Sequence, residues 1–246
     1  MGEKTKIFAI SDIHGHYTAM KDALLKAGFE KENPNHLLVC CGDYFDRGNE
    51  NMQVLKYLDC IENKVLLRGN HEEMLLEIFE TGKLKPHNFL NGTEETIKEF
   101  FGKYSIDEFG EIDFSGKTGI FNRAWEFMSA TANYYETKNY VFVHGWFPAS
   151  KTASGIKPQE NWRTADENAW HEARWTKWSD MIDVCTLIDG KTVVCGHYPT
   201  IFANMSYGKE GEERADIFYD NGVIAIDGGT YTTGRVNVLV VEDELI

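Results

Sequence analysis

Short runs of apolar residues recur along this chain, and many of them end at a group of polar residues. The clearest run is Leu37–Cys41, after which Gly42 is followed by Asp43, Asp46 and Arg47. An uninterrupted apolar run of this length is typical of a strand that is buried on both faces of a parallel sheet. Charged side chains directly after such a strand are costly unless they pair or bind an ion. The segment therefore predicts either an ion site or an ordinary Asp–Arg pair in a loop.

The same order of strand, polar turn and helix occurs before and after this segment. The expected strands are Lys6–Ile10, Leu37–Cys41 and Val65–Leu67, and the helices expected after them are marked by Tyr17–Ala27, Met52–Leu58 and Leu75–Phe79. Gly28 is expected to end the first of these helices. Asp12 and Asp43 are 31 residues apart, and Asp43 and Asn70 are 27 apart, each about the length of a βαβ unit of roughly 30 residues. Right-handed crossovers then place all three turns at one edge of a parallel sheet.

The second half of the chain continues this pattern after an interruption. Residues 81–135 hold polar helical pieces that are rich in Phe and Glu and broken by glycines, which predicts a helical insertion or cap within a single domain spanning residues 1–246. The later strands are expected at Tyr140–Val143, Val193–Cys195, Val223–Ile226 and Val236–Val241. Strands that alternate with helices indicate the α/β class.

Six expected strand ends carry Asp, Asn or His. The residues are Asp12, His14, Asp43, Asn70, His71, His144, His197 and Asp227. Any one of them could be a helix N-cap or a hydrogen-bonded surface histidine, but together they favour a metal site. Imidazole, carboxylate and amide groups without cysteine suit manganese, iron, zinc or cobalt.

Composition limits the partners and the compartment. The net charge of −14 excludes nucleic acid as the main partner, because no basic stripe is present. The apolar runs are too short to cross a membrane. Without an apolar segment and cleavage site near residue 1, the chain is expected in the cytoplasm. Five cysteines, an odd number, do not predict a disulfide framework, and Cys40, Cys41 and Cys195 are expected in the core.

Five motifs then occur in a fixed order. They are D-x-H-G (Asp12–Gly15), G-D-x-x-D-R-G (Gly42–Gly48), G-N-H-E (Gly69–Glu72), H-G (His144–Gly145) and G-H (Gly196–His197). This set resembles the calcineurin-like metallophosphoesterases, and within them the phosphoprotein phosphatase branch in a compact bacterial or phage form. The resemblance implies a four-layer α/β/β/α sandwich, in which central β-sheets are flanked by helices, and two divalent metal ions, with manganese preferred in vitro.

The resemblance also implies roles for single residues. Asp12 and His14 would bind the first metal, Asp43 would bridge, and Asn70, His144 and His197 would bind the second. A hydroxide between the metals would attack phosphorus directly, and His71, oriented by Asp46, would protonate the leaving oxygen. Arg47 would hold the phosphate. The family usually has a second phosphate-binding arginine, for which Arg174 is our choice and Arg163 the rival. The alternative role for Arg174 is a structural one, stacking on Trp170, Trp175 or Trp178.

Three functions are compatible with these residues. The favoured one is a serine/threonine protein phosphatase, with dual specificity left open, because Asp46 and Glu72 are both present. The alternative is a symmetrical dinucleoside polyphosphate hydrolase that cuts diadenosine tetraphosphate. A metal-binding module without catalysis is a lesser alternative, since no ligand is missing. Substrates are thus phosphorylated proteins or peptides, or small phosphoesters.

Some residues depart from the usual family pattern without removing a ligand. They are Ser11, Trp146, Phe147 and Tyr198, which bear on substrate preference rather than on chemistry. The tryptophans Trp162, Trp170, Trp175 and Trp178 could form a wall for stacking bases, but core packing is the favoured interpretation.

Overall fold

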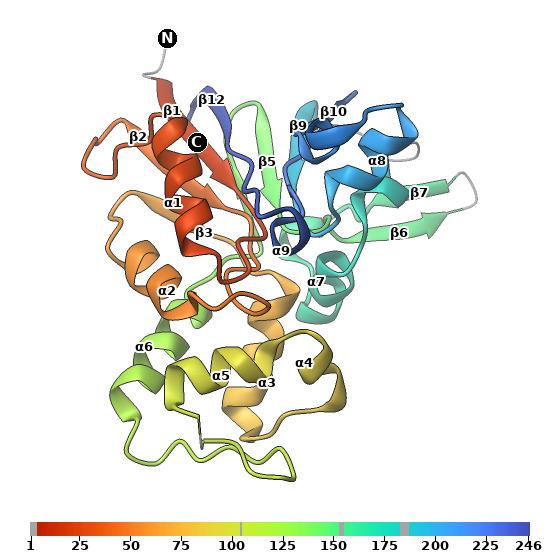
Figure 1. Ribbon diagram of the computed structural model, residues 1–246. Coiled ribbons are helices and arrows are strands. Elements are labelled where there is room, and N and C mark those ends of the chain that lie inside the picture. The colour runs from red at the N-terminus through yellow and green to blue at the C-terminus, as the bar shows by residue number, and fades with distance from the viewer. Residues whose placement is uncertain (1–3, 104, 153–154, 183–186) are drawn as a thin grey trace.

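Two β-sheets pack face to face in the computed structural model of this protein, and helices cover their outer sides (Figure 1). The structure describes residues 4–103, 105–152, 155–182 and 187–246. The expected α/β class, with central sheets between helices, is confirmed. Within the described residues, no helix has the length and apolar character that a membrane span needs.

The first sheet has the strand order β12-β1-β2-β3. Its strands are β1 (Lys4–Ile10), β2 (His36–Cys40), β3 (Lys64–Leu66) and β12 (Leu239–Glu244). The helices α1 (Tyr17–Lys26), α2 (Asn51–Asp59) and α3 (Asn70–Thr81) follow the first three strands in turn. Because β1, β2 and β3 are parallel neighbours, the three polar turns lie at one edge, as the sequence predicts. Gly28, with a φ of +83°, follows the C-terminus of α1 as expected.

The second sheet has the order β10-β11-β9-β5-β4, and β8 also pairs with β9. Its strands are β4 (Tyr134–Glu136), β5 (Tyr140–Val143), β8 (Leu187–Ile188), β9 (Lys191–Cys195), β10 (Phe218–Asp220) and β11 (Val223–Ala225). The central strands β5, β9 and β11 are parallel. The remaining elements of this half are the hairpin β6 (Ala149–Thr152) and β7 (Gly155–Pro158), the helices α7 (Glu167–Arg174), α8 (Thr200–Ser206) and α9 (Thr230–Thr233), and 3-10 turns at Trp162–Thr164, Trp178–Asp180 and Gly211–Ala215.

The last expected strand, Val236–Val241, begins and ends three residues later in the structure. Strand β12 covers Leu239–Glu244 and pairs antiparallel with β1. The pairing starts there because Leu239 lies opposite Ala9, close to the end of β1. Val236 and Val238 instead pack against the helical side of the first sheet.

Alternating residues of each strand divide the apolar interior into three layers. In β1, Phe8 and Ile10 face α1 to α3, whereas Ile7 and Ala9 face the second sheet. In the second sheet, Phe142, Val194 and Ile224 face the first sheet, and their neighbours Val141, Val193 and Val223 face the outer layer. Cys40, Cys41 and Cys195 are buried in these layers as expected, and Cys185 lies outside the described residues. One layer between the sheets and one outside each sheet give the four-layer sandwich.

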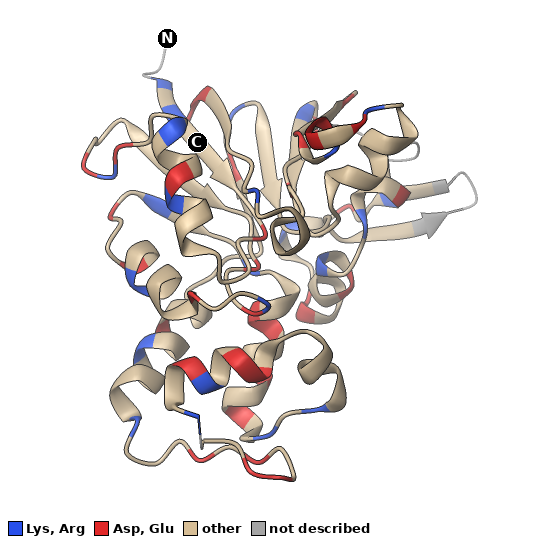
Figure 2. Cartoon of the chain, in the orientation of Figure 1, with Lys and Arg blue, Asp and Glu red and all other residues tan. Residues whose placement is uncertain are grey.

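The interval 81–135 holds the helices α4 (Pro86–Leu90), α5 (Thr93–Phe101) and α6 (Thr118–Ser129). They lie beside α2 and α3, at the bottom of the view in Figure 1. Phe79 of α3 stacks on Phe121 of α6, and Phe101 of α5 packs edge-on against Phe79. Acidic residues are frequent on α3, on α5 and in the loop after α5, whereas basic residues are scattered (Figure 2). Phe100, Phe101 and Phe127 of this interval are therefore part of the apolar interior, whereas Phe89 and Phe109 are exposed.

Candidate metal centre

The predicted metal ligands lie together where the carboxyl ends of the parallel strands of the two sheets meet. Asp12 and Asp43 follow β1 and β2 of the first sheet, and His144 and His197 follow β5 and β9 of the second. Hydrogen bonds join the two halves here: the ring nitrogen Nδ1 of His144 lies 2.7 Å from the Cys41 carbonyl oxygen, and the His197 N–H donates to the Asp12 carboxylate at 2.9 Å. The two sheets therefore form one site.

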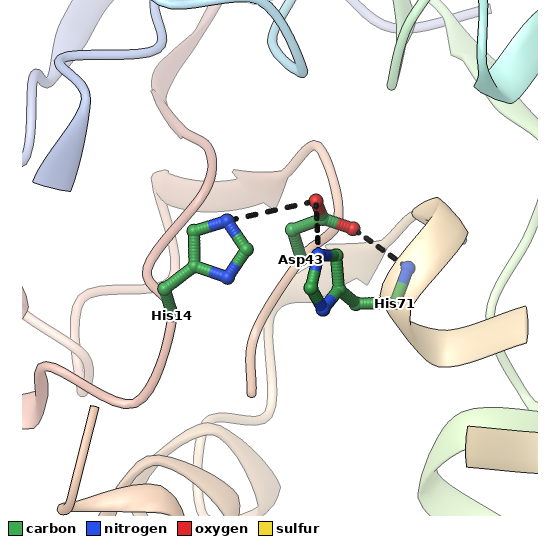
Figure 3. Close-up of side chains that lie close together, drawn as sticks. All are labelled: His14, Asp43 and His71. Carbon is green, nitrogen blue, oxygen red and sulfur yellow. Dashed lines mark hydrogen bonds and ion pairs between the residues drawn. The ribbon is translucent and has the colours of Figure 1, made fainter. Parts of the chain in front are cut away.

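Two groups of donor atoms share the Asp43 carboxylate. One contains His14, Asp43 and His71, and the other contains Asp43, His144 and His197, with the donor atoms of each group within 4.8 Å of one another. Figure 3 shows the imidazole rings of His14 and His71 beside the carboxylate of Asp43, whose Oδ2 is 3.7 Å from His14 Nε2. Asp43 is thus common to both groups, and its role as the bridging ligand stays a prediction.

The two remaining predicted ligands lie at the edges of these groups. Asp12 Oδ1 is 4.0 Å from His14 Nε2. The side-chain oxygen of Asn70 is 2.9 Å from His144 Nε2 and 3.0 Å from His197 Nδ1. The structure thus brings all six predicted ligands together.

Hydrogen bonds on the far side of two histidines show that these donors fit a metal ion. Nδ1 of His144 and Nδ1 of His14 face the carbonyl oxygens of Cys41 and Phe45, at 2.7 and 3.0 Å. A carbonyl oxygen only accepts, so each Nδ1 carries the proton and each neutral ring turns the lone pair of Nε2 inward. Nε2 of His144 then faces the acceptor oxygens of Asn70 and of Asp43, the latter at 3.4 Å. Lone pairs that converge in this way repel each other unless a cation lies between them.

Burial leads to the same conclusion. It raises the pKa of the Asp43 carboxyl well above its usual range, and the charges of Asp12 and Glu72 add to this effect. Burial also lowers the pKa of His14 well below its usual value, with further lowering by His71 and Arg47, and it lowers the pKa of His144. A divalent cation binds neutral imidazoles and ionised carboxylates. It would therefore stabilise these buried groups in the protonation states that bind metal.

The backbone of the site is held in an unusual conformation. Seven described residues other than glycine have a positive φ, and six of them belong to the predicted site: Asp12, His14, Asp43, Asp46, Arg47 and His197. Each such residue costs on the order of 1–3 kcal/mol, and such strain is typical of functional sites. Gly196 permits the packing, since a Cβ there would lie 1.9 Å from Ser11 Oγ. The surrounding fold thus fixes the direction of the ligand side chains.

Arg47, His71 and Asp46 form a chain beside the ligands. The Arg47 guanidinium lies 2.7 Å from His14 Nε2 through Nη1 and 3.1 Å from His71 Nε2 through Nη2. On the other side of its ring, His71 Nδ1 is 2.6 Å from Asp46 Oδ2, and both side chains are completely buried. Burial raises the pKa of Asp46 to about 7, although two threonine hydroxyls and Arg47 oppose this shift. Nε2 of His71 therefore faces the Arg47 guanidinium.

The role of Glu72 and the burial of Asp227 were not predicted. The Glu72 carboxylate accepts hydrogen bonds from the backbone N–H groups of Asp43, Tyr44 and Gly69 at 2.8–2.9 Å. The spacing of Gly69 and Glu72, that of a capping box, was the signal that could have identified it. Asp227, noted only as a polar strand end, is buried, and its pKa is raised by burial and by Asp12.

The two candidate second arginines are engaged elsewhere. Arg174 is buried and bonds to Asn133 at 2.8 Å, to Glu73 at 2.9 Å and to Glu167. Arg163 pairs with Glu136 and Asp189 and lies over the ring of Trp162 at 4.3 Å. Among the described residues, neither Arg163 nor Arg174 forms a hydrogen bond or an ion pair with Arg47, His71 or Asp46. Either arginine would have to leave these carboxylates to bind a phosphate.

The tryptophans divide into two groups. Trp162, Trp170 and Trp178 are at most 2% exposed, which confirms core packing for them. Trp175 is 43% exposed, and its ring centroid is 6.1 Å from that of His197. This one tryptophan therefore lies at the surface beside a predicted ligand.

Comparison with known proteins identifies the family. The family profile described as calcineurin-like phosphoesterase matches residues 5–229, nearly the whole chain. The chain belongs to the calcineurin-like phosphoesterases. The match confirms the resemblance inferred from the motifs, and the family name implies metal ions of the kind that the donor set fits.

Individual calcineurin-like phosphoesterases similar to this chain have two kinds of activity in their names. Serine/threonine-protein phosphatase 2 of Escherichia coli is 39% identical over 79 residues, which are 31% of this chain and 34% of the relative. The symmetrical bis(5'-nucleosyl)-tetraphosphatase of Buchnera aphidicola is 34% identical over 104 residues, which are 42% of this chain and 32% of the relative. The matches thus span about a third of the length of these relatives.

A solved structure supports the fold. A serine/threonine phosphatase from Saccharomyces cerevisiae with similarity to human phosphatase PP5 aligns with a TM-score of 0.58 at 16% identity, covering 98% of this chain and 80% of that one.

Proposed function

We propose that this phosphoesterase hydrolyses phosphoserine and phosphothreonine in proteins or peptides. The observation that supports this substrate class best is the buried pair of His71 and Asp46, with 2.6 Å between Nδ1 and Oδ2. An alkoxide is a poor leaving group and gains most from a positioned proton donor. The leaving group of a phosphoanhydride is itself a phosphate, which departs more readily and needs an acid less. A positioned proton donor therefore favours phosphomonoesters over phosphoanhydrides as substrates.

In this proposal the ions occupy two positions. Asp12 and His14 would hold one, Asn70, His144 and His197 the other, and Asp43 both. Manganese, iron, zinc and cobalt accept such ligands, and manganese is our first choice in vitro. When bound, the ions would neutralise the carboxylates and lower the pKa of a water for attack on phosphorus.

The side chains around the ions then have separate tasks. Arg47 would bind two phosphoryl oxygens with its planar guanidinium. His71, carrying a proton on each ring nitrogen once Arg47 has turned from Nε2 to the phosphate, would give the proton on Nε2 to the departing oxygen of the serine or threonine and keep the proton on Nδ1. Asp46 would keep Nδ1 protonated and hold the ring toward the substrate. Arg174 stays a prediction as a second phosphate ligand.

The test compares two substrate classes on the same preparation. The full chain, reconstituted with manganese, is assayed on a panel of phosphoserine, phosphothreonine and phosphotyrosine peptides and on diadenosine tetraphosphate. We expect a higher kcat/KM on the phosphoserine and phosphothreonine peptides. A higher kcat/KM on diadenosine tetraphosphate would contradict the proposal.

Arg47→Lys is expected to weaken inhibition by inorganic phosphate about tenfold, which corresponds to one charge-assisted hydrogen bond of roughly 1.5 kcal/mol. Lysine keeps the charge but cannot reproduce the two-pronged contact. Metal content should stay unchanged. Phosphate inhibition constants measure the effect, and Arg163→Lys serves as the matched control. The same assay on Arg174→Lys tests the second arginine, and an unchanged constant for Arg47→Lys would exclude Arg47 as the phosphate ligand.

Exposed aromatic rings beside the site favour a second candidate, the hydrolysis of dinucleoside polyphosphates. Tyr231 is 59% exposed, and the Arg47 guanidinium lies 5.9 Å from the centroid of its ring. Tyr231 lines a cavity of about 200 Å³ together with His14, Arg47 and His197. A nucleobase could stack on such a ring next to the phosphate-binding groups.

Tyr231→Ala separates the two candidates. If a base stacks there, KM for diadenosine tetraphosphate should rise about fivefold, since stacking contributes roughly 1 kcal/mol or more per base. The kcat/KM on a phosphoserine peptide should change less than twofold. Tyr219→Ala, at another exposed tyrosine (62%), is the control. An equal change on both substrates would remove the support for nucleotide stacking.

A further inference from the structure

Helix α5 of the 81–135 interval reaches the predicted acid. Both carboxylate oxygens of Asp46 accept a hydroxyl from this helix: Thr93 Oγ1 donates to Oδ2 at 2.8 Å, and Thr96 Oγ1 donates to Oδ1 at 2.6 Å. The two threonines are three residues apart, so they lie on one face of the helix. Thr93, Thr96, Asp46 and His71 are all completely buried. This contact joins segments 47 and 50 residues apart in the sequence.

The same helix face also holds the backbone around Asp46. The Asp46 N–H donates to Thr96 Oγ1 and to the side-chain oxygen of Asn51, each at 3.0 Å. One turn further along α5, Glu99 accepts from both nitrogens of Asn51 and from the Met52 N–H at 2.7–3.0 Å. Asp46 has a φ of +73°, a conformation that an aspartate keeps only when its surroundings fix it. Helix α5 therefore supports the strained turn as well as the carboxylate.

These contacts determine the direction in which the Asp46 carboxylate can accept a further hydrogen bond. With Oδ1 bonded to Thr96, the carboxylate plane is fixed and Oδ2 is directed at Nδ1 of His71. Because both threonine hydroxyls donate, Asp46 acts as an acceptor toward His71, so the proton lies on Nδ1. Nε2 is then held 3.1 Å from Arg47, the residue that the proposed function assigns to the substrate phosphate.

We propose that Thr93 and Thr96 are positioning residues for the proton donor, and that the insertion carrying α5 is thereby part of the catalytic apparatus. The inference rests on the proposed function, since His71 acts as the acid there. The threonines act through Asp46 and touch no substrate. A purely structural role, in which the hydroxyls only satisfy a buried carboxylate, would lower stability without changing the demand for a good leaving group.

The kinetic test replaces one hydroxyl while keeping the shape of the side chain. For Thr96→Val we expect kcat on a phosphothreonine peptide to fall about tenfold, a part of the 10²–10⁴-fold that a general acid contributes. On p-nitrophenyl phosphate, whose leaving group needs less protonation, kcat should fall less than twofold, and KM should stay constant on both. Thr96→Ser keeps the hydroxyl and should restore the peptide rate. The matched control is Thr137→Val, because Thr137 is also buried and also donates to a carboxylate, that of Asp243, at 2.6 Å.

A second readout does not depend on turnover. The proton on Nδ1 of His71 should give a low-field NMR signal in the manganese-free, zinc-loaded protein, assigned by its absence in His71→Asn. We expect Thr96→Val to shift or lose this signal and Thr96→Ser to keep it. An unchanged signal, or equal losses of kcat on both substrates without rescue by serine, would overturn the inference. Thr93→Val provides the same test if Thr96→Val does not fold. If the wild-type protein hydrolyses no phosphomonoester, the proposed function fails, while the NMR result still decides whether the threonines position His71.

Discussion

Asp43→Asn is expected to release the bound metal ions and to reduce phosphoester hydrolysis more than about a hundredfold, because even partners outside the ligand shell can contribute 10–100-fold. Asp43 belongs to both groups of donor atoms, so one substitution disturbs both positions. Its Oδ1 also accepts the His71 N–H at 3.0 Å, at the start of α3. Metal content after gel filtration and release of inorganic phosphate are the two measurements.

The control for this variant is Asp243→Asn. Asp243 is also buried and hydrogen-bonded, to Thr137 and Asn139, but it lies on β12. This variant should keep its metals and most of its activity. Two tightly bound ions and near-normal turnover in Asp43→Asn would show that Asp43 is not the bridge.

His71→Asn is expected to keep both metals and to lose about 10²–10⁴-fold in kcat on phosphoserine peptides, the range for a general acid. The loss should be much smaller on p-nitrophenyl phosphate. The reason is that His71 is bonded through Nδ1 to Asp46 and turns Nε2 toward Arg47, where the substrate phosphate would lie. Rates on a series of aryl and alkyl phosphates measure the effect.

His171→Asn serves as the comparison, since His171 is exposed and paired with Glu73. His71 also falls within one of the donor groups. Loss of metal from His71→Asn would therefore assign it as a ligand, and equal losses on good and poor leaving groups would reject it as the acid.

Most of the architecture around the candidate metal centre could be predicted from the sequence, because each predicted ligand follows a local pattern. An apolar run that ends at Asp12, Asp43 or Asn70 predicts both a strand and a turn at its carboxyl end. Parallel pairing then brings these turns together without any knowledge of side-chain contacts. The same pattern located His144 and His197 after the strands of the second sheet.

Contacts between segments that are distant in the sequence could not be predicted from these local patterns. Nothing in the local pattern around Thr93 and Thr96 connects them with Asp46, because helical periodicity shows only that they share a face. The ion pairs of Arg174 could not be predicted either, because its partners Glu73 and Glu167 lie on two different helices. The beginning of β12 depends on its register with β1, and apolar residues before it, such as Val236, look the same in a sequence as those within the strand.

The position of β12 has a consequence for the order of events during synthesis. β1 lies between β2 and β12, and β2 leaves the ribosome soon after β1, whereas β12 begins only at residue 239. One edge of β1 therefore lacks its partner strand until Leu239 and the residues after it have been made. An open strand edge is a template for pairing with other chains. Until β12 pairs, this edge of β1 is therefore a place where the nascent protein can pair with another chain, and pairing of β12 covers it.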